Sequence, residues 1–388
     1  MNGETVMSRL FARLLGTSPF LMILIGLAVL TANVPAGAQV PDKAALLKAA
    51  QAEGVVIVHG PPGRQYEKLL SKSFEEGHPG IKVEYSGANN RTAVPKLFRE
   101  REANIFLWDV WMGGPATILS QLMPRGVLAP LPPVLLTENT DDAKWLHGFA
   151  DGWMDNAKQY NYAFDAGLQE TAWVNWDFVS KDEIKSVEDV LKPKFSGKIL
   201  FDEPRRGGSG NGSSLGLLVN YGEDFLRKVY GHNITVTDNR RQAAEWLVRG
   251  RYPVVFGTGL DEFTIFWEQG IGKNLTPIPV PEGEKVQMTP GFGSVSLVDR
   301  APHPNAATLY INWLLSLDGQ TKWTQVPRTS RRLDAPCIDL CQRNREVLAK
   351  AGDNYFKGQD EEAVPKRERA AQIAKDVIKA AMPKGSED

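Results

Sequence analysis

Residues 54–77 read GVVIVHGPPGRQYEKLLSKSFEEG, a β-branched run that ends in a glycine turn and leads into helical apolar spacing. The same order occurs twice more, because IKVEYSG (81–87) precedes RTAVPKLFRERE and WDVWMGG (108–114) precedes PATILSQLMPRG. Pro95 is expected in the first turn of its helix, where a proline is tolerated. Repeated strand–helix units predict an α/β fold with a mostly parallel sheet that helices cover on both faces.

Polar, glycine-rich loops follow the three strands and read HGPPGR, SGANNR and MGGP. Ligands of such sheets bind beyond the carboxyl ends of the strands. Arg64, Asn89, Arg91 and Gly113 in these loops are therefore candidate ligand contacts. The alternatives are a solvated surface position for each arginine and a plain turn for Asn89, because asparagine tolerates left-handed backbone.

A second strand–helix unit begins with KILFDEP (198–204) and continues, after a glycine-rich segment, into SSLGLLVNYGEDFLRKVY (213–230). Ser213 or Ser214 is expected to cap the helix, because a serine hydroxyl accepts hydrogen bonds from the first backbone N–H groups. The glycine-rich segment therefore lies between a strand end and a helix start.

The segment RRGGSGNG (205–212) carries two arginines beside glycines whose backbone can approach a ligand closely. Because a helix N-terminus favours negative charge, Arg205, Arg206 and the backbone N–H groups of Gly207 and Gly208 are predicted to bind an anion. The segment matches neither GxxxxGK[ST] nor a strict GxGxxG, so no nucleotide site is predicted. The alternative is a mobile surface loop with solvated arginines.

The N-terminus has the pattern of an export signal. Arg9 and Arg13 precede the apolar run FLMILIGLAVL (20–30), and Ala36 and Ala38 form an A-x-A site, so cleavage before Gln39 is expected. The run is shorter than the roughly 20 residues that span a bilayer, which disfavours the alternative of an uncleaved anchor. The mature chain is expected to be periplasmic.

Cleavage would remove two arginines and one glutamate, which changes the formal net charge from −1 to −2. A near-neutral chain without a basic block is not typical of nucleic-acid binding. About 350 residues favour two lobes, because a single core rarely grows that large. Cys337 and Cys341 are expected to form a local disulfide after export, with unpaired thiols as the alternative.

Several stretches, in order, resemble extracellular solute-binding proteins of ABC importers, in the branch with ferric-ion-binding and thiamine-binding proteins. The stretches are SFEEGHPGIKVEY (73–85), WDVWMGGPATILSQLMPRGVLAPL (108–131), LKPKFSGKILFDEP (191–204), LVRGRYPVVFG (247–257), VPEG (280–283) and HPNAATLYINWLLSLDGQTKW (303–323). The resemblance implies the type 2 periplasmic binding fold, with two α/β lobes, two crossing strands and a ligand cleft. It also implies a monomer that delivers a small-molecule solute to an inner-membrane permease, with no cofactor and no chemical change to the solute.

The resemblance also implies a domain plan. A signal peptide (1–38) precedes the first lobe (39–165 and 280–335), which encloses the second lobe (166–279). The crossing strands are expected near 162–164 and 281–290. The tail 336–388 reads as helices from 342 onward, which the resemblance places on the first lobe.

Ferric members of this branch bind metal through a carboxylate and an adjacent tyrosine pair. Here Gly114 stands at the carboxylate position, Leu260 and Asp261 stand at the tyrosine positions, and His59 falls a few residues before the family's histidine. Ferric iron prefers several anionic oxygens, and only Asp261 of that set remains. Direct iron binding is therefore disfavoured, and an iron chelate held by arginines stays an alternative.

The remaining candidates are cationic and aromatic, which predicts an anionic organic solute. Arginine forks bind carboxylate, phosphate or phosphonate, and aromatic rings provide flat contacts, with core packing as the alternative for each ring. Phe164 and Trp173 are further aromatic candidates. The predicted ligand-binding set is Arg64, Asn89, Arg91, Trp111, Gly113, Tyr162, Arg205, Arg206, Gly207, Gly208, Thr258 and Asp261.

The competing functional class is an exported hydrolase. Asp109, Glu203 and Asp261 supply carboxylates and His59 is a possible base, but the sequence has no HExxH motif, and its GxSxG match (212–216) overlaps the start of the predicted helix 213–230 and does not directly follow a strand. A catalytic site requires an assembled set of such groups, so a non-enzymatic binding protein is favoured. A receptor that serves a sensor in place of a permease is a third alternative.

Overall fold

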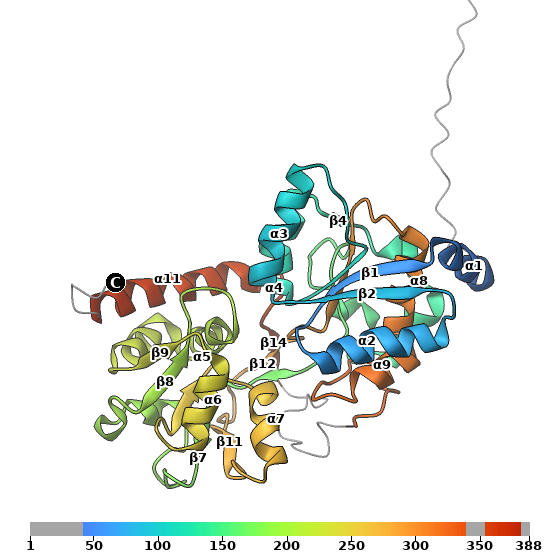
Figure 1. Cartoon of the computed structure of the whole chain (residues 1–388). Coiled ribbons are helices and arrows are strands. Elements are labelled where there is room, and N and C mark those ends of the chain that lie inside the picture. The colour runs from blue at the N-terminus through green and yellow to red at the C-terminus, as the bar shows by residue number, and fades with distance from the viewer. Residues whose placement is uncertain (1–41, 339–353, 382–388) are drawn as a thin grey trace, which may run out of the picture. The chain divides into compact units, whose positions relative to one another are not determined.

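The computed structural model describes residues 42–338 and 354–381, and its first sheet has the strand order β2-β1-β3-β13-β4 (Figure 1). Central β1 runs parallel to β2 and β3, whereas β13 runs antiparallel to β3, β4 and β5. The three predicted strands are confirmed, but the sheet is mixed because β13 returns late in the sequence. The strands are β1 (Val55–Gly60), β2 (Lys82–Gly87), β3 (Val110–Met112), β4 (Leu128–Ala129), β5 (Tyr162–Ala163) and β13 (Ser294–Val298).

Helices pack on this sheet around an apolar core that includes Leu70, Phe74, Tyr310 and Trp323. They are α1 (Lys43–Glu53), α2 (Arg64–Gly77), α3 (Asn90–Glu102), the short α4 (Pro115–Thr117), α8 (Pro304–Leu315) and α9 (Leu317–Trp323). Short π and 3-10 turns cover Ile118–Leu122, Met123–Arg125, Pro132–Val134, Thr137–Asn139, Asp142–Lys144 and Phe149–Gly152. Because α3 begins at Asn90, Pro95 lies in its second turn and not in the first.

The second sheet has the order β11-β7-β10-β8-β9. Strands β8, β9 and β10 are parallel, and β7 runs antiparallel to β10 and β11. The strands are β7 (Ala172–Asn175), β8 (Ile199–Asp202), β9 (Thr235–Thr237), β10 (Val254–Phe256) and β11 (Leu275–Pro277). The helices are α5 (Ser209–Gly231, kinked at Gly222), α6 (Arg240–Val248) and α7 (Leu260–Glu268), with 3-10 turns at Val187–Leu191 and Pro193–Phe195.

A third, small sheet joins the other two, and we call it the linking sheet. It has the order β14-β12-β6 and contains β6 (Leu168–Gln169), β12 (Val286–Met288) and β14 (Tyr355–Lys357). The chain passes from β5 through β6 to β7, and it returns from β11 through β12 to β13. Beside these passages, the backbone N–H groups of Phe164 and Asp165 both donate to Gly293 O, at 2.9 and 3.2 Å.

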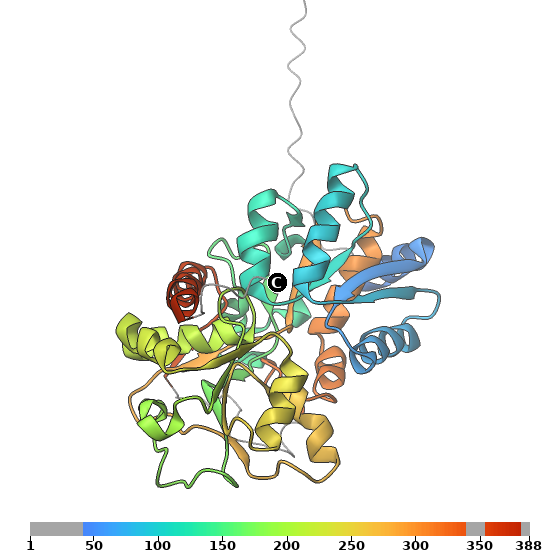
Figure 2. The ribbon, with the colours of Figure 1, turned by 60° about the vertical axis from the view of Figure 1, so that its left-hand side comes forward.

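The C-terminal helix α11 (Ala363–Ala381) packs against α5, and Figures 1 and 2 both show it in red beside that helix. Ala370, Ile373, Ala374 and Ile378 of α11 join the apolar core of the second sheet. The expectation that the C-terminal helices pack on the first lobe is therefore wrong for α11, because its apolar stripe is complementary to α5. Residues 355–357, expected to be helical, form β14, since they pair with β12.

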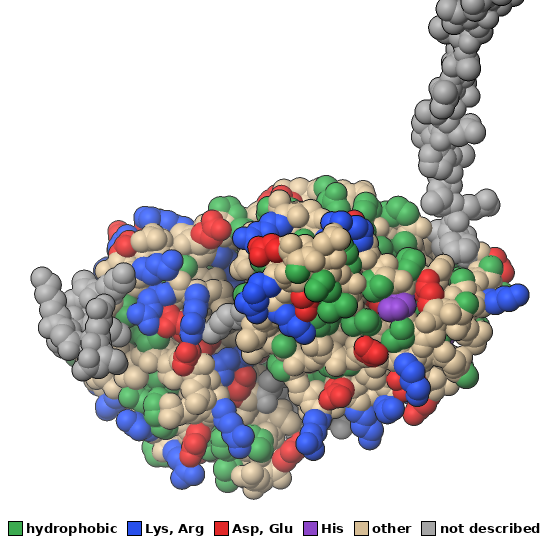
Figure 3. Space-filling model, turned by 45° about the horizontal axis from the view of Figure 1, so that its top comes forward, with side chains coloured by type: hydrophobic (Ala, Val, Ile, Leu, Met, Phe, Trp, Pro, Cys, Tyr) green, Lys and Arg blue, Asp and Glu red, His purple; other side chains and the backbone are tan. Residues whose placement is uncertain are grey.

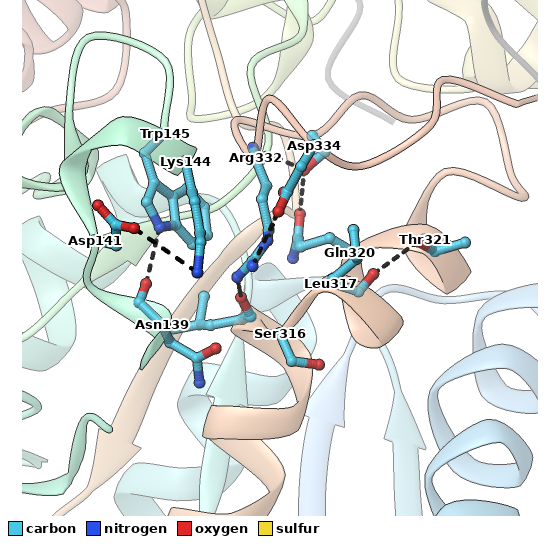
Figure 4. A network of polar contacts seen from close by, with 12 residues as sticks. Asn139, Asp141, Lys144, Trp145, Ser316, Leu317, Gln320, Thr321, Arg332 and Asp334 are labelled. Carbon is cyan, nitrogen blue, oxygen red and sulfur yellow. Dashed lines mark hydrogen bonds and ion pairs between the residues drawn. The ribbon is translucent and has the colours of Figure 1, made fainter. Parts of the chain in front are cut away.

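A polar network anchors the segment after α9 to the first sheet's helices (Figure 4). Arg332 donates to Leu315 O at 3.0 Å and to both oxygens of Asp334 at 2.7 and 3.2 Å. Its guanidinium also lies over the ring of Trp145, whose Nε1 donates to Asn139 O at 2.8 Å. The return of the chain to the first sheet is thus tied down by hydrogen bonds as well as by apolar packing.

Acidic and basic side chains are interspersed on the face drawn in Figure 3. Within the described ranges, no helix is long and apolar enough to span a bilayer. The signal-peptide prediction and Cys341 of the predicted disulfide lie outside the described residues, so both stay predictions.

Candidate functional site

The loop after β2 places Asn90, and not the predicted Asn89, among the strand ends of the first sheet. Asn90 is only 8% exposed, accepts a hydrogen bond from Trp111 Nε1 at 3.2 Å and donates to Gly114 O at 3.5 Å. Asn89 is exposed, and its carbonyl accepts the first hydrogen bonds of α3. The side chain of Asn90 therefore stabilises the end of β3, whereas the backbone of Asn89 forms the turn that begins α3.

His59, at the end of β1, is buried against tryptophans. Its ring centroid lies 3.9 Å from that of Trp111, and Trp108 approaches both rings edge-on. Burial lowers the pKa of His59 to about 4, so the imidazole is neutral at neutral pH. The His59 side chain is buried between the first sheet and its helices, so it is not exposed to solvent as a ligand-binding side chain would be.

The predicted aromatic contacts are core residues. Trp111, Tyr162, Phe164 and Trp173 are each fully buried. The ring of Tyr162 stacks on Phe149, with centroids 4.3 Å apart. The prediction that these rings contact a solute is wrong, because each ring is buried in the protein core and leaves no surface for a solute.

Gly113 and Arg64 lie at two other strand ends. The N–H of Gly113 donates to Ser294 O at 3.2 Å, and its carbonyl accepts from Ser294 Oγ at 2.7 Å. A Cβ on Gly113 would lie 2.7 Å from Asn90 Oδ1, so close packing explains this glycine. Arg64 is exposed at the first position of α2, and Arg91 lies in the first turn of α3.

The arginine–glycine loop, which we define as residues 203–208, connects β8 to α5. Arg205 donates to both oxygens of Glu203 at 2.8 and 2.7 Å. Burial opposes ionisation of Glu203, but the bonds from Arg205 hold the pKa of Glu203 below its ordinary value. Arg206 pairs with Asp238 at 2.8 Å, and both side chains are about half exposed (47% and 64%). Arg205 therefore forms a two-point ion pair with Glu203, whereas the ion pair of Arg206 with Asp238 is exposed and weak.

Helix α5 begins at Ser209, four residues before the predicted start. Its first turn is stabilised by Asp202, whose Oδ2 accepts from the N–H of Gly210 at 3.0 Å. Gly208 precedes the helix with φ of 148°, a conformation that favours glycine. Ser213 and Ser214 lie inside the helix, where Ser214 Oγ donates to Gly210 O at 2.7 Å, so neither serine is the cap.

The end of β10 lies against this helix start. A Cβ on Gly257, which has φ of 81°, would lie 2.6 Å from the Cα of Gly210. Thr258 follows, fully buried, and its Oγ1 has no hydrogen-bond partner among the described residues. Asp261 lies in the first turn of α7, but its side chain is outside the described part of the chain.

Residues that follow strands of different sheets lie close together at two places near the loops after β3 and β8. A Cβ on Gly207 would lie 4.0 Å from Thr117 Oγ1, which follows β3. Gln359, just after β14, donates to Thr289 Oγ1 at 2.5 Å, and its Oε1 would lie 3.1 Å from a Cβ on Gly114. Sequence reasoning missed Asn90, Thr117 and Gln359, because only the fold shows that they neighbour the predicted loops.

Within the described ranges, no group of three His, Cys, Asp or Glu side chains is close enough to bind a metal ion. Asp109, named as a possible catalytic carboxylate, is fully buried, where it accepts from the N–H of Ile57 at 2.7 Å and contacts His303 Nδ1 at 2.9 Å. Its two oxygens therefore support the sheet and the start of α8.

Comparisons with known proteins identify the family. The family model of bacterial extracellular solute-binding proteins matches residues 58–321. An uncharacterised protein of Haemophilus influenzae is 23% identical over 313 residues, which are 78% of this chain and 83% of that protein.

Solved structures with a similar fold include the iron-bound HitA from Pseudomonas aeruginosa, with a TM-score of 0.64 and 15% identity over 83% of this chain and 99% of HitA. The periplasmic binding protein AfuA from Actinobacillus pleuropneumoniae, bound to fructose 6-phosphate, has a TM-score of 0.60 and 21% identity over 84% of this chain and 99% of AfuA. The predicted type 2 fold and the resemblance are confirmed. The chain belongs to the bacterial extracellular solute-binding protein family, whose members bind solutes for transport.

Proposed function

We propose that this chain captures a small organic solute with an anionic group in the periplasm and delivers it to an ABC permease. The observation that carries this proposal is the arginine–glycine loop, which precedes a helix N-terminus and presents the exposed Gly207, Gly208 and Arg206. A helix N-terminus favours negative charge. On the buried side of this N-terminus, the carboxylate of Asp202 already accepts a hydrogen bond from the N–H of Gly210.

Arg206 is the cation best suited to meet the solute. Its pair with Asp238 is half exposed, and such pairs contribute at most about 1 kcal/mol, so a solute anion can replace Asp238 as its partner. Arg205 supports the loop through Glu203, and exposed Arg64 and Asn89 at the first sheet supply further polar contacts. The proposed lobes are 39–165 with 280–335, and 166–279.

An organic solute fits this chain better than direct iron binding. AfuA is bound to fructose 6-phosphate and HitA to iron, so similar folds hold both kinds of solute. In this chain Gly114 and Leu260 occupy positions where the resemblance places iron ligands, and neither side chain supplies an anionic oxygen. An iron chelate held by Arg206 is the second candidate, because a chelate such as ferric citrate brings its own carboxylates.

The first prediction tests the solute class on the mature chain (39–388). Fructose 6-phosphate or another sugar phosphate should raise the melting temperature and be recovered intact, whereas fructose should not, because ligand binding stabilises the folded state. Turnover of the hit would support the hydrolase alternative. A shift with ferric citrate alone would favour the chelate, and no shift with any anion would overturn the proposed solute class.

The two arginines should separate binding from folding. Arg206→Ala should weaken binding about 10- to 100-fold with little change in stability, because a charge-assisted hydrogen bond contributes about 1.5–3 kcal/mol. Arg205→Ala should lower stability by about 1–3 kcal/mol, because Glu203, only 9% exposed, loses its partner. If Arg206→Ala binds the hit like the parent and with the same salt dependence, this loop is not the anion site.

A further inference from the structure

Arg367, in the first turns of α11, is a buried arginine whose partners are backbone carbonyls. The residue is 8% exposed, its Nη2 donates to Gly208 O at 3.1 Å, and its Nη1 donates to Gly358 O at 2.9 Å. Its own carbonyl accepts from Asn211 Nδ2 at 2.9 Å. No carboxylate pairs with its guanidinium within the described residues, so salt-bridge formation does not explain why a cation is buried here.

The bond to Gly208 restrains the orientation of one peptide at the end of the arginine–glycine loop. In a trans peptide the C=O and the following N–H point in opposite directions. Because Gly208 O points toward Arg367, the N–H of Ser209 points away from α11 at the first residue of α5. The same carbonyl accepts the first hydrogen bond of α5, from the N–H of Gly212 at 3.0 Å, so Arg367 adds a second bond that restrains this peptide at a glycine with φ of 148°.

The bond to Gly358 connects the same guanidinium to the linking sheet. The N–H of Gly358 donates to Met288 O at 2.9 Å, which extends the pairing of β14 with β12. The adjacent Gln359 donates to Thr289 Oγ1. Arg367 therefore joins the loop at the start of α5 to the strand through which the chain returns to the first sheet.

We propose that Arg367 is a positioning residue for solute binding, which orients the Gly208–Ser209 peptide and couples it to the linking sheet. This role rests on the proposed function, because it assigns Arg367 to the anion-binding loop. Burial lowers the pKa of Arg367 to about 10, so the group stays charged at neutral pH and adds positive charge beside the start of α5. A lysine cannot replace it, since only a guanidinium reaches two carbonyls with a rigid fork.

Hydrogen–deuterium exchange of the mature, unliganded protein tests the positioning role. Arg367→Gln and Arg367→Lys should speed exchange about tenfold or more in residues 203–212 and 356–361, because each bond from a charged donor contributes about 1.5–3 kcal/mol. Exchange in residues 215–231 of α5 should stay at the parental rate. The matched control is Arg369→Gln, on the same helix, where Arg369 is exposed and pairs with Glu223 at 2.6 Å.

Two results would overturn the proposal. Parental exchange in both segments of Arg367→Gln would show that the bonds fix nothing, and faster exchange throughout α5 and α11 would show a purely structural role in their packing. These readouts need no ligand, so they decide the role of Arg367 even if no anion stabilises the parent. Where a sugar phosphate does bind, Arg367→Lys should weaken it about 10-fold, with Arg369→Gln at parental affinity.

Discussion

Asp165 is a buried carboxyl beside the chain passages between the two large sheets. It is 2% exposed and accepts from Trp323 Nε1 at 3.0 Å, from the N–H of Gly167 at 2.9 Å and from Thr329 Oγ1. Burial raises the pKa of Asp165 to about 6, although Arg328 and these donors favour the ionised form. The stability of the folded chain is therefore expected to depend on pH through this one residue.

The sign of this dependence follows from the raised pKa. The folded chain binds this proton more tightly than the unfolded chain, so the contribution to stability is complete below about pH 3.8 and is lost as pH rises through about 6. Relative to Asp165→Asn, the parent should lose on the order of 2 kcal/mol between pH 4 and pH 7, measured by urea unfolding. The exposed Asp224→Asn is the control, and an identical pH profile for parent and Asp165→Asn would contradict the assignment.

At the scale of elements, strands were easier to predict than helix boundaries. Strands β1 and β2 follow from β-branched runs that end in glycine, a signal contained in the sequence itself. The start of α5 depends on Asp202 and on the neighbouring end of β10, both brought there by the sheet. Glycine has low helix propensity, so local signals placed the start at the serines, four residues too late.

The contact between β10 and α5 supports a prediction about two glycines. Gly257→Ala should destabilise by more than about 2 kcal/mol, because its Cβ would lie 2.6 Å from the backbone of Gly210 in addition to the strain of a positive φ. Gly222 has a similar φ of 79° but no atom within 4 Å of its Cβ position. Gly222→Ala should therefore cost only about 1 kcal/mol in chemical unfolding, and equal losses for the two variants would contradict the steric argument.

At the scale of the whole molecule, sequence resemblance predicted the fold but not the side chains of the site. The order and spacing of the stretches that resemble the family predict two lobes. Residue type alone predicts Trp111 and Tyr162 as ligand contacts, but both are core residues. Gln359 lies 70 residues from Thr289, and Arg367 lies 159 residues from Gly208. The helix that carries Arg367, α11, has an ordinary amphipathic pattern, which does not indicate which sheet it packs on.

Closure of the two lobes over a solute is the prediction at this scale. Small-angle scattering of the mature chain should give a smaller radius of gyration with a tightly bound solute than without it, because we expect the lobes to close about the linking sheet. Arg206→Ala at the same solute concentration is the control, since its occupancy should be lower. A tight complex with an unchanged radius would rule out closure for this chain.

The packing of α11 on α5 also has a consequence for how the chain matures. Ala370, Ile373 and Ile378 join the core to which Leu217, Leu226 and Val229 of α5 contribute, so the apolar surface of α5 is completed only by the last helix that the structure describes. If the predicted signal peptide directs export with the N-terminus first, this apolar surface of α5 stays uncovered until α11 has followed. Chains cut short before residue 363 would expose it permanently, which makes premature termination a route to aggregation in the export compartment.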